Sequence, residues 1–198
     1  MAKSPEETRR QLIEVAFEEI HLNGFQAASI SKIIEHTQLS KGALYHHFAN
    51  KTQLGYAVVE EYLRPIFIEM WIKPLEAQED PILGIVSIFK SHKENRSPEM
   101  LNKGCPLNNL IQEMAPIDDG FRRRLQNILD MWKNTLTASF ERGKQKGHVR
   151  ADVNPSEAAD FVMAVVEGMS SLSKNIQDSS VIESCMPQFI IYLEALRK

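Results

Sequence analysis

The residues best suited to chemistry lie within residues 29–51, where hydrogen-bond donors follow a helical spacing. Tyr45 offers a hydroxyl donor, and His46 offers a ring N–H donor. Leu44 and Phe48 are four residues apart, so both can face a core while the polar side chains point away from it. This spacing predicts a short helix whose outer face donates hydrogen bonds, as contact with phosphates or base edges requires.

Neighbouring residues extend this face. Gly42 and Ala43 are small, so the start of the helix can approach a ligand closely, and the free N–H groups there favour phosphate. Ser29 and Ser40 are suited to cap two successive helices. Lys51 adds a cation at the start of the next helix. Arg9 and Arg10 add two more at the start of the first helix. The predicted interface consists of Arg9, Arg10, Ser29, Ser40, Lys41, Gly42, Ala43, Tyr45, His46, His47 and Lys51.

The periodicity of the chain predicts that helices position these residues. Apolar residues recur at spacings of three and four between Gly, Pro and Asn breaks, and no long alternation typical of strands is present. Gly24 and Gly147 are typical helix stops, whereas Pro65 removes a backbone hydrogen bond and predicts a bend. The expected helices are residues 5–22, 30–36, 41–47, 50–72, 81–93, 107–114, 121–146, 155–175 and 181–197.

The second and third expected helices lie across a tight turn inside a three-helix unit. This is the arrangement of a helix-turn-helix, in which the second helix of the pair enters the DNA major groove. We therefore expect an all-α chain with a DNA-binding domain at residues 1–50. Residues 51–198 would form a larger helical domain.

Composition limits the remaining classes. The chain has 198 residues, 43% of them hydrophobic and 25% charged, which is typical of a globular protein. Its net charge of −3 does not indicate nucleic-acid binding, so that case rests on the motif. Two cysteines far apart indicate a reduced compartment. The first residues lack the apolar run of a signal peptide, and no stretch resembles a membrane helix, so we expect a cytoplasmic protein without a membrane partner.

The last two expected helices are apolar nearly all round. A helix with two apolar faces needs two partners, so this pair predicts half of an intermolecular four-helix bundle. A dimer would also place two recognition helices in successive major grooves of a palindromic site. The predicted dimer residues are Phe161, Val165, Gly168, Met169, Phe189, Tyr192, Leu193 and Leu196.

Residues 8–55 closely resemble the N-terminal signature of the tetracycline-repressor (TetR) family. The residues that carry the resemblance are Gly24, Phe25, Ser29, Ile30, Ile33, the run from Leu39 to Phe48, Lys51 and Leu54. The resemblance implies a homodimeric repressor that binds a palindromic operator in double-stranded DNA and is released by a small-molecule effector. The resemblance also implies a regulator that needs no cofactor and is not an enzyme.

The resemblance also implies individual roles. Tyr45 and His47 would contact phosphates, Lys51 would contact the DNA backbone, and Lys41, Gly42, Ala43 and His46 would lie at or near bases. The chain departs from the family pattern at two places. Gln38 stands in the turn where Gly is usual, and Ile34 stands where a small Ala is usual. Because Gln resists positive φ, the turn should follow a somewhat different path.

By the same resemblance, the middle helices would surround an effector cavity. Large apolar residues there would line it, although the same pattern is also typical of an ordinary core. The expected pocket residues are Phe67, Met70, Trp71, Phe89, Cys105, Leu110, Met114, Phe121 and Trp132.

Cys105 leaves two interpretations open. The segment resembles a Gly-Cys-Leu element of some family sensor domains, and a helix start beside Lys103 would lower the thiol pKa and make it reactive. Alternatively, Cys105 is a small buried apolar residue.

The rival function is a cysteine-dependent enzyme or stand-alone sensor without DNA binding, with His92 or His148 as the base. A second rival is a helical adaptor. Cys185 should be inert, and no metal-ligand pattern is present.

Overall fold

The computed structural model describes residues 4–198 except positions 36 and 38. Two expected features, the end of the second helix at His36 and the turn residue Gln38, therefore lie outside the described residues. The chain forms two compact units. Unit 1 comprises Met1–Ile66 and Asn109–Gln126, and unit 2 comprises Phe67–Asn108 and Asn127–Lys198. The units thus differ from a single division after residue 50, because residues 109–126 join the N-terminal part.

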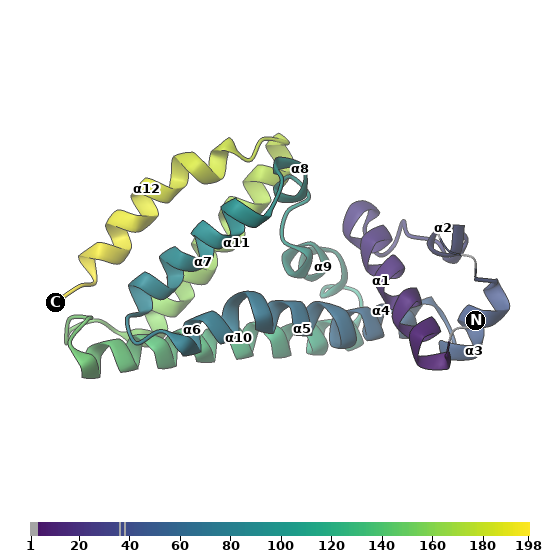
Figure 1. The fold of residues 1–198 in the computed structure, drawn as a ribbon, viewed down its shortest axis with the longest axis horizontal. Helices are drawn as coiled ribbons and strands as arrows, with labels where there is room; N and C mark the ends of the chain where they lie inside the picture. The colour runs from purple at the N-terminus through teal and green to yellow at the C-terminus, as the bar shows by residue number, and fades with distance from the viewer. Residues whose placement is uncertain (1–3, 36, 38) are drawn as a thin grey trace. The chain divides into compact units, whose positions relative to one another are not determined.

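The expected all-α fold is confirmed by the elements that Figure 1 labels. Within the described residues, the one isolated β-bridge pairs Val149 with Arg197. Helix bounds agree closely with those expected from periodicity. The elements are α1 (Pro5–Asn23), α2 (Ile30–Glu35), α3 (Lys41–His47), α4 (Lys51–Ala57), η1 (Val58–Leu63), α5 (Arg64–Phe67), η2 (Ile68–Ile72), α6 (Lys73–Ala77), α7 (Pro81–Asn95), α8 (Pro98–Leu101), α9 (Pro106–Met114), α10 (Asp119–Lys146), α11 (Pro155–Ile176) and α12 (Ser180–Ala195).

In unit 1, α1 packs against α2, α3 and α4. Its core is built from apolar residues at helical spacing, and Leu12, Ile33 and Leu44 are fully buried. Local sequence fixes the ends of α1. Ser4 accepts a hydrogen bond from the backbone of Glu7, whose carboxylate accepts one from Ser4 N–H. Gly24 ends α1 with φ of 83°, a conformation that glycine adopts without a Cβ penalty.

The remainder of the unit 1 core joins α4 to the segment after α9. The rings of Phe25 and Phe121 lie 4.7 Å apart, edge to face. Gly55 lies between them, and a Cβ there would come within 2.6 Å of Phe121. Tyr56 donates a hydrogen bond of 2.7 Å to Asp118, which also caps the start of α10 by accepting from Phe121 N–H. These contacts explain why residues 109–126 belong to unit 1.

Widened π-helical turns interrupt the helical stretch that follows Lys51. Segments η1 and η2 each end just before a residue followed by proline, at Arg64-Pro65 and Lys73-Pro74. The N–H groups of Arg64 and Lys73 donate to carbonyls five residues back. A helical proline has no N–H and collides with the carbonyl four residues earlier, so a wider turn just before it relieves the crowding. Helical structure continues to Ala77 instead of ending near residue 72.

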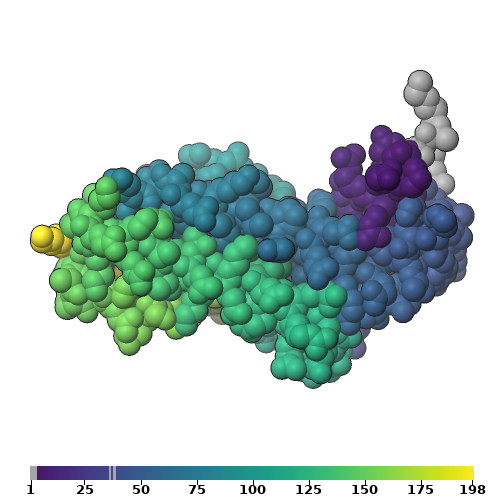
Figure 2. All heavy atoms as spheres, turned by 90° about the horizontal axis from the view of Figure 1, so that it is seen from below, coloured from purple at the N-terminus to yellow at the C-terminus, as the bar shows by residue number. Residues whose placement is uncertain are grey.

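In unit 2, α12 packs against both α7 and α11, as Figure 1 shows. Figure 2 shows the green surface of α10 beside the blue surface of residues near 75 on one face. Arg142 of α10 donates to the carbonyl of Leu75 at 3.0 Å, and Gly143 leaves no room for a Cβ against Pro81. Gly147 ends α10 with φ of 81°, as expected.

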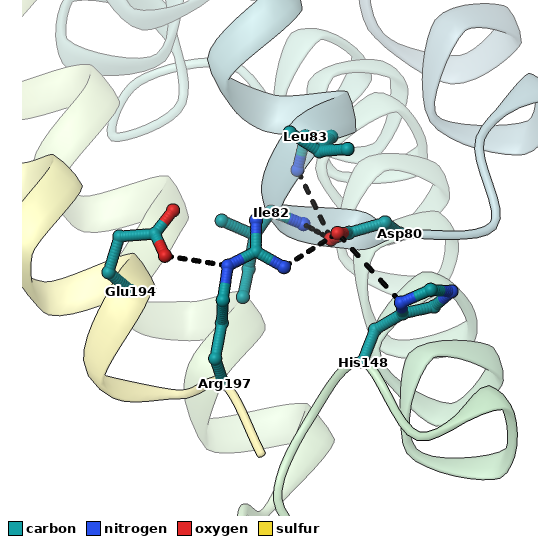
Figure 3. A network of polar contacts seen from close by, with 6 residues as sticks. All are labelled: Asp80, Ile82, Leu83, His148, Glu194 and Arg197. Atoms are coloured by element: carbon teal, nitrogen blue, oxygen red, sulfur yellow. Dashed lines mark hydrogen bonds and ion pairs between the residues drawn. The ribbon is translucent and has the colours of Figure 1, made fainter.

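A polar network ties the C-terminal residues to the start of α7 (Figure 3). Asp80 caps α7 by accepting from the backbone N–H groups of Ile82 and Leu83, and it also accepts from Arg197 at 2.6 Å. Burial alone would raise the pKa of Asp80, but the hydrogen bonds from Arg197 and the backbone leave this pKa below its ordinary value. His148 lies 4.0 Å from the same carboxylate.

Among the described residues, no helix has the length and apolar character needed to cross a membrane.

Candidate nucleic-acid interface

Helix α3 presents the expected polar face to solvent. Leu44 and Phe48 are buried at 0% and 3% exposure, which fixes the rotation of the helix. Tyr45 is therefore 52% exposed, although large aromatic side chains usually bury most of their surface. Lys41, Gly42 and His46 are also exposed, whereas Ala43 and His47 are half-buried.

Two serines fix the geometry of this face. Ser40 caps α3 by accepting from Ala43 N–H at 3.1 Å, and Ser29 accepts from Lys32 N–H at 3.2 Å before α2. Both predicted caps are therefore present. Each hydroxyl is engaged with the backbone, so these serines position the two helices.

Arg9 holds α3 in place. Its guanidinium pairs with Glu61 of η1, donates to the His47 carbonyl at 3.4 Å, and lies 4.5 Å from the centre of the Phe48 ring. A cation at the C-terminal carbonyls of a helix also complements the helix dipole. Arg9 is thus engaged inside unit 1. Its neighbour Arg10 is 76% exposed and lies 3.8 Å from Glu14.

The structure gives Lys51 a role that the sequence did not indicate. Its ammonium group donates to the carbonyls of Ala28 at 2.6 Å and Gln26 at 3.1 Å, and it lies over the ring of Phe25. Burial lowers the pKa of Lys51, and the charge of Glu113 opposes that shift. Lys51 therefore holds the loop between α1 and α2 and does not point freely outward, as an open phosphate contact would require.

Glu113 of α9 also binds this loop. Its two carboxylate oxygens accept from the backbone N–H groups of Phe25 at 2.7 Å and Gln26 at 2.8 Å. Sequence reasoning missed this residue because its partners lie almost 90 positions away and no local motif marks it. Glu113 and Lys51 together define a loop clamp that holds both the donors and the acceptors of residues 25–28.

The expected pocket residues divide between the two units. Leu110, Met114 and Phe121 belong to the buried core of unit 1. In unit 2, Trp71 is the centre of an aromatic group. Its ring lies 4.8 Å from that of Trp132, 5.9 Å from Phe89 and 6.4 Å from Phe67. Met70, which precedes Trp71 in the chain, is half-buried.

Cys105 lies just before α9 in unit 2 and donates its thiol hydrogen to Glu167 of α11, with a sulfur–oxygen distance of 3.4 Å. Burial and the charge of Glu167 raise the pKa of the Cys105 thiol far above its ordinary value. Backbone N–H groups at the start of α9 only partly offset this. The expectation of a lowered pKa is therefore wrong, because desolvation outweighs the effect of the helix start. Burial also raises the pKa of Glu167 to about 7.

The expected dimer residues fall into two groups. Met169, Phe189, Leu193 and Leu196 are buried within the protomer, where α11 and α12 pack together, and so they already have partners. Phe161 remains 45% exposed, Gly168 is exposed, and Val165 and Tyr192 are half-buried. The structure adds further exposed apolar residues on the same helices, namely Leu172, Ile176 and Ile191.

No group of three or more His, Cys, Asp or Glu side chains is arranged to hold a metal ion within the described part of the chain.

Comparison with known families decides the class of the chain. Residues 12–58 match the family described as "Bacterial regulatory proteins, tetR family". Residues 84–189 match "Tetracyclin repressor-like, C-terminal domain", which is more than half of the chain. The chain belongs to the TetR family. It is therefore a helix-turn-helix, DNA-binding regulator of transcription, and the family evidence points away from an enzyme.

This TetR-family chain resembles two curated regulators. It is 26% identical over 160 residues to the transcriptional regulator AcuR of Cereibacter sphaeroides, covering 80% of this chain and 73% of AcuR. It is 24% identical over 168 residues to the transcriptional repressor DhaR of a Mycobacterium species, covering 85% and 82% of the two chains.

Solved TetR-family structures share the fold. A regulator from Cytophaga hutchinsonii superposes with a TM-score of 0.86 at 20% identity, covering 100% of this chain and 98% of the other. A regulatory protein from Rhodobacter sphaeroides gives a TM-score of 0.81 at 23% identity, covering 91% and 96%. At these identities, the likeness concerns the fold alone.

Proposed function

We propose that this TetR-family chain is a repressor that binds a palindromic operator as a homodimer and leaves it when a small molecule occupies unit 2. The observation that carries the proposal is the outer face of α3, where Tyr45 is half exposed above a fully buried Leu44. An exposed donor on the second helix of a helix-turn-helix is suited to the DNA surface.

The proposed DNA contacts come from α3. Tyr45 and His47 bind phosphates, and Lys41, Gly42, Ala43 and His46 lie at or near base edges. Gly42 suits this position because its surroundings are open, and a Cβ there would meet only the Ser40 hydroxyl, at 3.6 Å. Arg9 and Lys51 act indirectly, since they hold α3 and the loop before α2.

A homodimer supplies most of the proposed affinity. The net charge of the chain is −3, and the cations Arg9 and Lys51 are engaged within unit 1, so each subunit neutralises few phosphates. The exposed apolar residues of α11 and α12 offer a surface for a second copy of the chain. Two copies would place their α3 helices in successive major grooves.

Release by a reversible ligand is favoured over release by a reactive thiol. A thiol that donates to a carboxylate in a desolvated site stays protonated and reacts slowly. The same contact weighs against a Cys105 enzyme, because the thiol partner is Glu167 and not a histidine. His92 Nε2 has no hydrogen-bond partner, and His148 lies beside Asp80.

Operator binding is tested by fluorescence anisotropy with DNA from just upstream of the coding sequence, at low salt and with unrelated DNA as competitor. Tyr45→Ala and Lys41→Ala should each weaken specific binding about tenfold or more, because each removes a contact worth about 1–3 kcal/mol. Lys90→Ala, an exposed lysine of α7, should bind as the unchanged chain does. The proposal fails if specific binding is absent or if both α3 variants bind normally.

A further inference from the structure

Unit 2 contains buried polar groups that lack partners. Among the described side chains, Glu167 Oε2, His92 Nε2 and Trp132 Nε1 are buried without a hydrogen bond. The side chain of Arg96 is half-buried, and its guanidinium donates a hydrogen bond to the thioether sulfur of Met70 at 2.6 Å. Thioether sulfur is a weak acceptor, and native proteins rarely leave such groups unpaired.

A series of pairwise contacts and charge effects links these groups. His92 and Arg96 are four residues apart at the end of α7, and the His92 ring lies 5.5 Å from Trp71. Trp71 in turn packs against Trp132. The charge of Arg96 acts on both His92 and Cys105, and Cys105 donates to Glu167. We call this group the sensor cluster; it comprises Trp71, His92, Arg96, Trp132 and Glu167.

The chemistry of the sensor cluster specifies what would satisfy it. Arg96 and Trp132 can only donate hydrogen bonds, so a partner must supply acceptors. Burial and the Arg96 charge lower the pKa of His92 to about 4, so Arg96 is the full positive charge of the cluster at neutral pH. A planar guanidinium is matched by a carboxylate, which accepts two parallel hydrogen bonds.

The neighbouring aromatic side chains specify the rest of the ligand. Trp71 and Trp132 present flat rings, with Phe67 and Phe89 beside them. Aromatic rings favour a flat apolar body in offset or edge contact. Sites for small molecules typically combine aromatic side chains with a few polar groups.

We infer that the sensor cluster binds a small aromatic carboxylate, with the acid group on Arg96 and the ring against the aromatic side chains of unit 2. This ligand class deepens the proposed function, because it rests on unit 2 being the effector-binding part. Glu167 and His92 would then form hydrogen bonds with other polar groups of the ligand.

Intrinsic fluorescence tests the inference directly, because both tryptophans of the chain lie in the sensor cluster. The full-length protein is titrated with benzoate and phenylacetate, and with benzamide and phenylacetamide as uncharged matches. Excitation at the red edge of tryptophan absorption avoids the probes. At least one acid should quench or shift the emission saturably and bind about tenfold or more tighter than its amide, as expected for a charge-assisted pair.

Arg96→Met should abolish that preference, whereas Arg96→Lys should keep part of it because the charge remains. Arg64→Met, at an exposed arginine of α5, is the matched control. Circular dichroism establishes that each variant is folded. Equal binding of acid and amide, no binding of either acid, or unchanged acid binding in folded Arg96→Met would each overturn the inference. Absence of acid binding would fit ordered water at these groups, and unchanged acid binding in folded Arg96→Met would place the acid at another site.

Operator binding is measured in the same preparation, so the two ideas fail separately. If the protein binds its operator but no acid changes the fluorescence, the ligand class is wrong and the proposed function stands. If acids bind through Arg96 but no operator is bound, the ligand class stands and the repressor proposal fails. Release of bound operator by the acid, at concentrations that saturate the fluorescence change, would support both.

Discussion

Cys105 illustrates how the surroundings of a single side chain decide its chemistry. Its thiol donates to Glu167 and its pKa is raised by burial, so very little thiolate exists at pH 8. With Cys185→Ser as the background, we expect Cys105 to react with a disulfide reagent at least about a hundredfold slower in the folded chain than in urea. Rates within tenfold of each other would contradict this assignment.

Glu167 makes stability depend on pH. Burial raises its pKa from 4.5 to about 7, so the folded state favours the protonated form. Below about pH 4.5 the group is protonated in both states and costs nothing; the penalty for ionisation grows as pH rises and is complete above about pH 7.

The variant Glu167→Gln should therefore match the unchanged chain at pH 4.5. At pH 8 it should be more stable by on the order of 2 kcal/mol, because Gln cannot ionise. Urea unfolding at the two pH values measures this, with exposed Glu94→Gln as the control. An equal gain at both pH values would show that ionisation of Glu167 is not the cause.

At the scale of single residues, the sequence was sufficient to predict which side chains face solvent. It was insufficient to predict which side chains form hydrogen bonds or ion pairs with distant residues. The exposure of Tyr45 follows from the four-residue spacing of Leu44 and Phe48, which is a local pattern. Arg9 and Lys51 were assigned to DNA because cations at helix starts suit phosphate. Their actual partners, Glu61 and the carbonyls of residues 26 and 28, depend on packing between distant segments.

At the scale of elements, helix bounds could be predicted because stops and caps are local. Asn50 caps α4 by accepting from Gln53 N–H at 2.9 Å, and Gly24 and Gly147 end α1 and α10. The short helix α8 was missed because four residues are too few to show a helical period. The π turns were missed because hydrophobic periodicity reports a face and not the number of residues in a turn.

The loop clamp is the element that tests how α9 supports the DNA-reading helices. Glu113→Gln keeps one acceptor for the N–H groups of Phe25 and Gln26 but loses the second and the charge. We expect amide hydrogen exchange at these two residues to become about fivefold faster, since a hydrogen bond contributes about 1 kcal/mol. Exposed Glu76→Gln should leave both rates unchanged. Unchanged exchange rates in Glu113→Gln would show that Glu113 does not hold this loop.

At the scale of the whole molecule, the family and its all-α class were predictable from one motif and a helical period. The division into units was not, because residues 109–126 join the N-terminal part through Phe121 and Asp118, which no composition shift marks. Burial of half of the expected dimer residues was likewise missed. An apolar helix face looks the same in sequence whether it packs inside a chain or between chains.

Assembly is tested with a matched pair of exposed leucines. Leu172 of α11 is 48% exposed beside other apolar residues, and Leu83 of α7 is 55% exposed on another helix. A buried unpaired carboxylate is strongly unfavourable, so Leu172→Glu should yield monomers by light scattering and lose operator binding. Leu83→Glu should remain dimeric. A dimeric Leu172→Glu variant would place the interface elsewhere.

The π turns before Pro65 and Pro74 also bear on which length changes the chain can accept. A deletion inside an α-helix normally rotates every later residue by about 100°, which follows from 3.6 residues per turn. A π turn holds one residue more than the α turn that it replaces. Loss of one codon within residues 58–63 or 68–72 could therefore be absorbed by rewinding to an α turn. These prolines thus mark the positions where the helical stretch can lose a residue and keep its remaining faces in register.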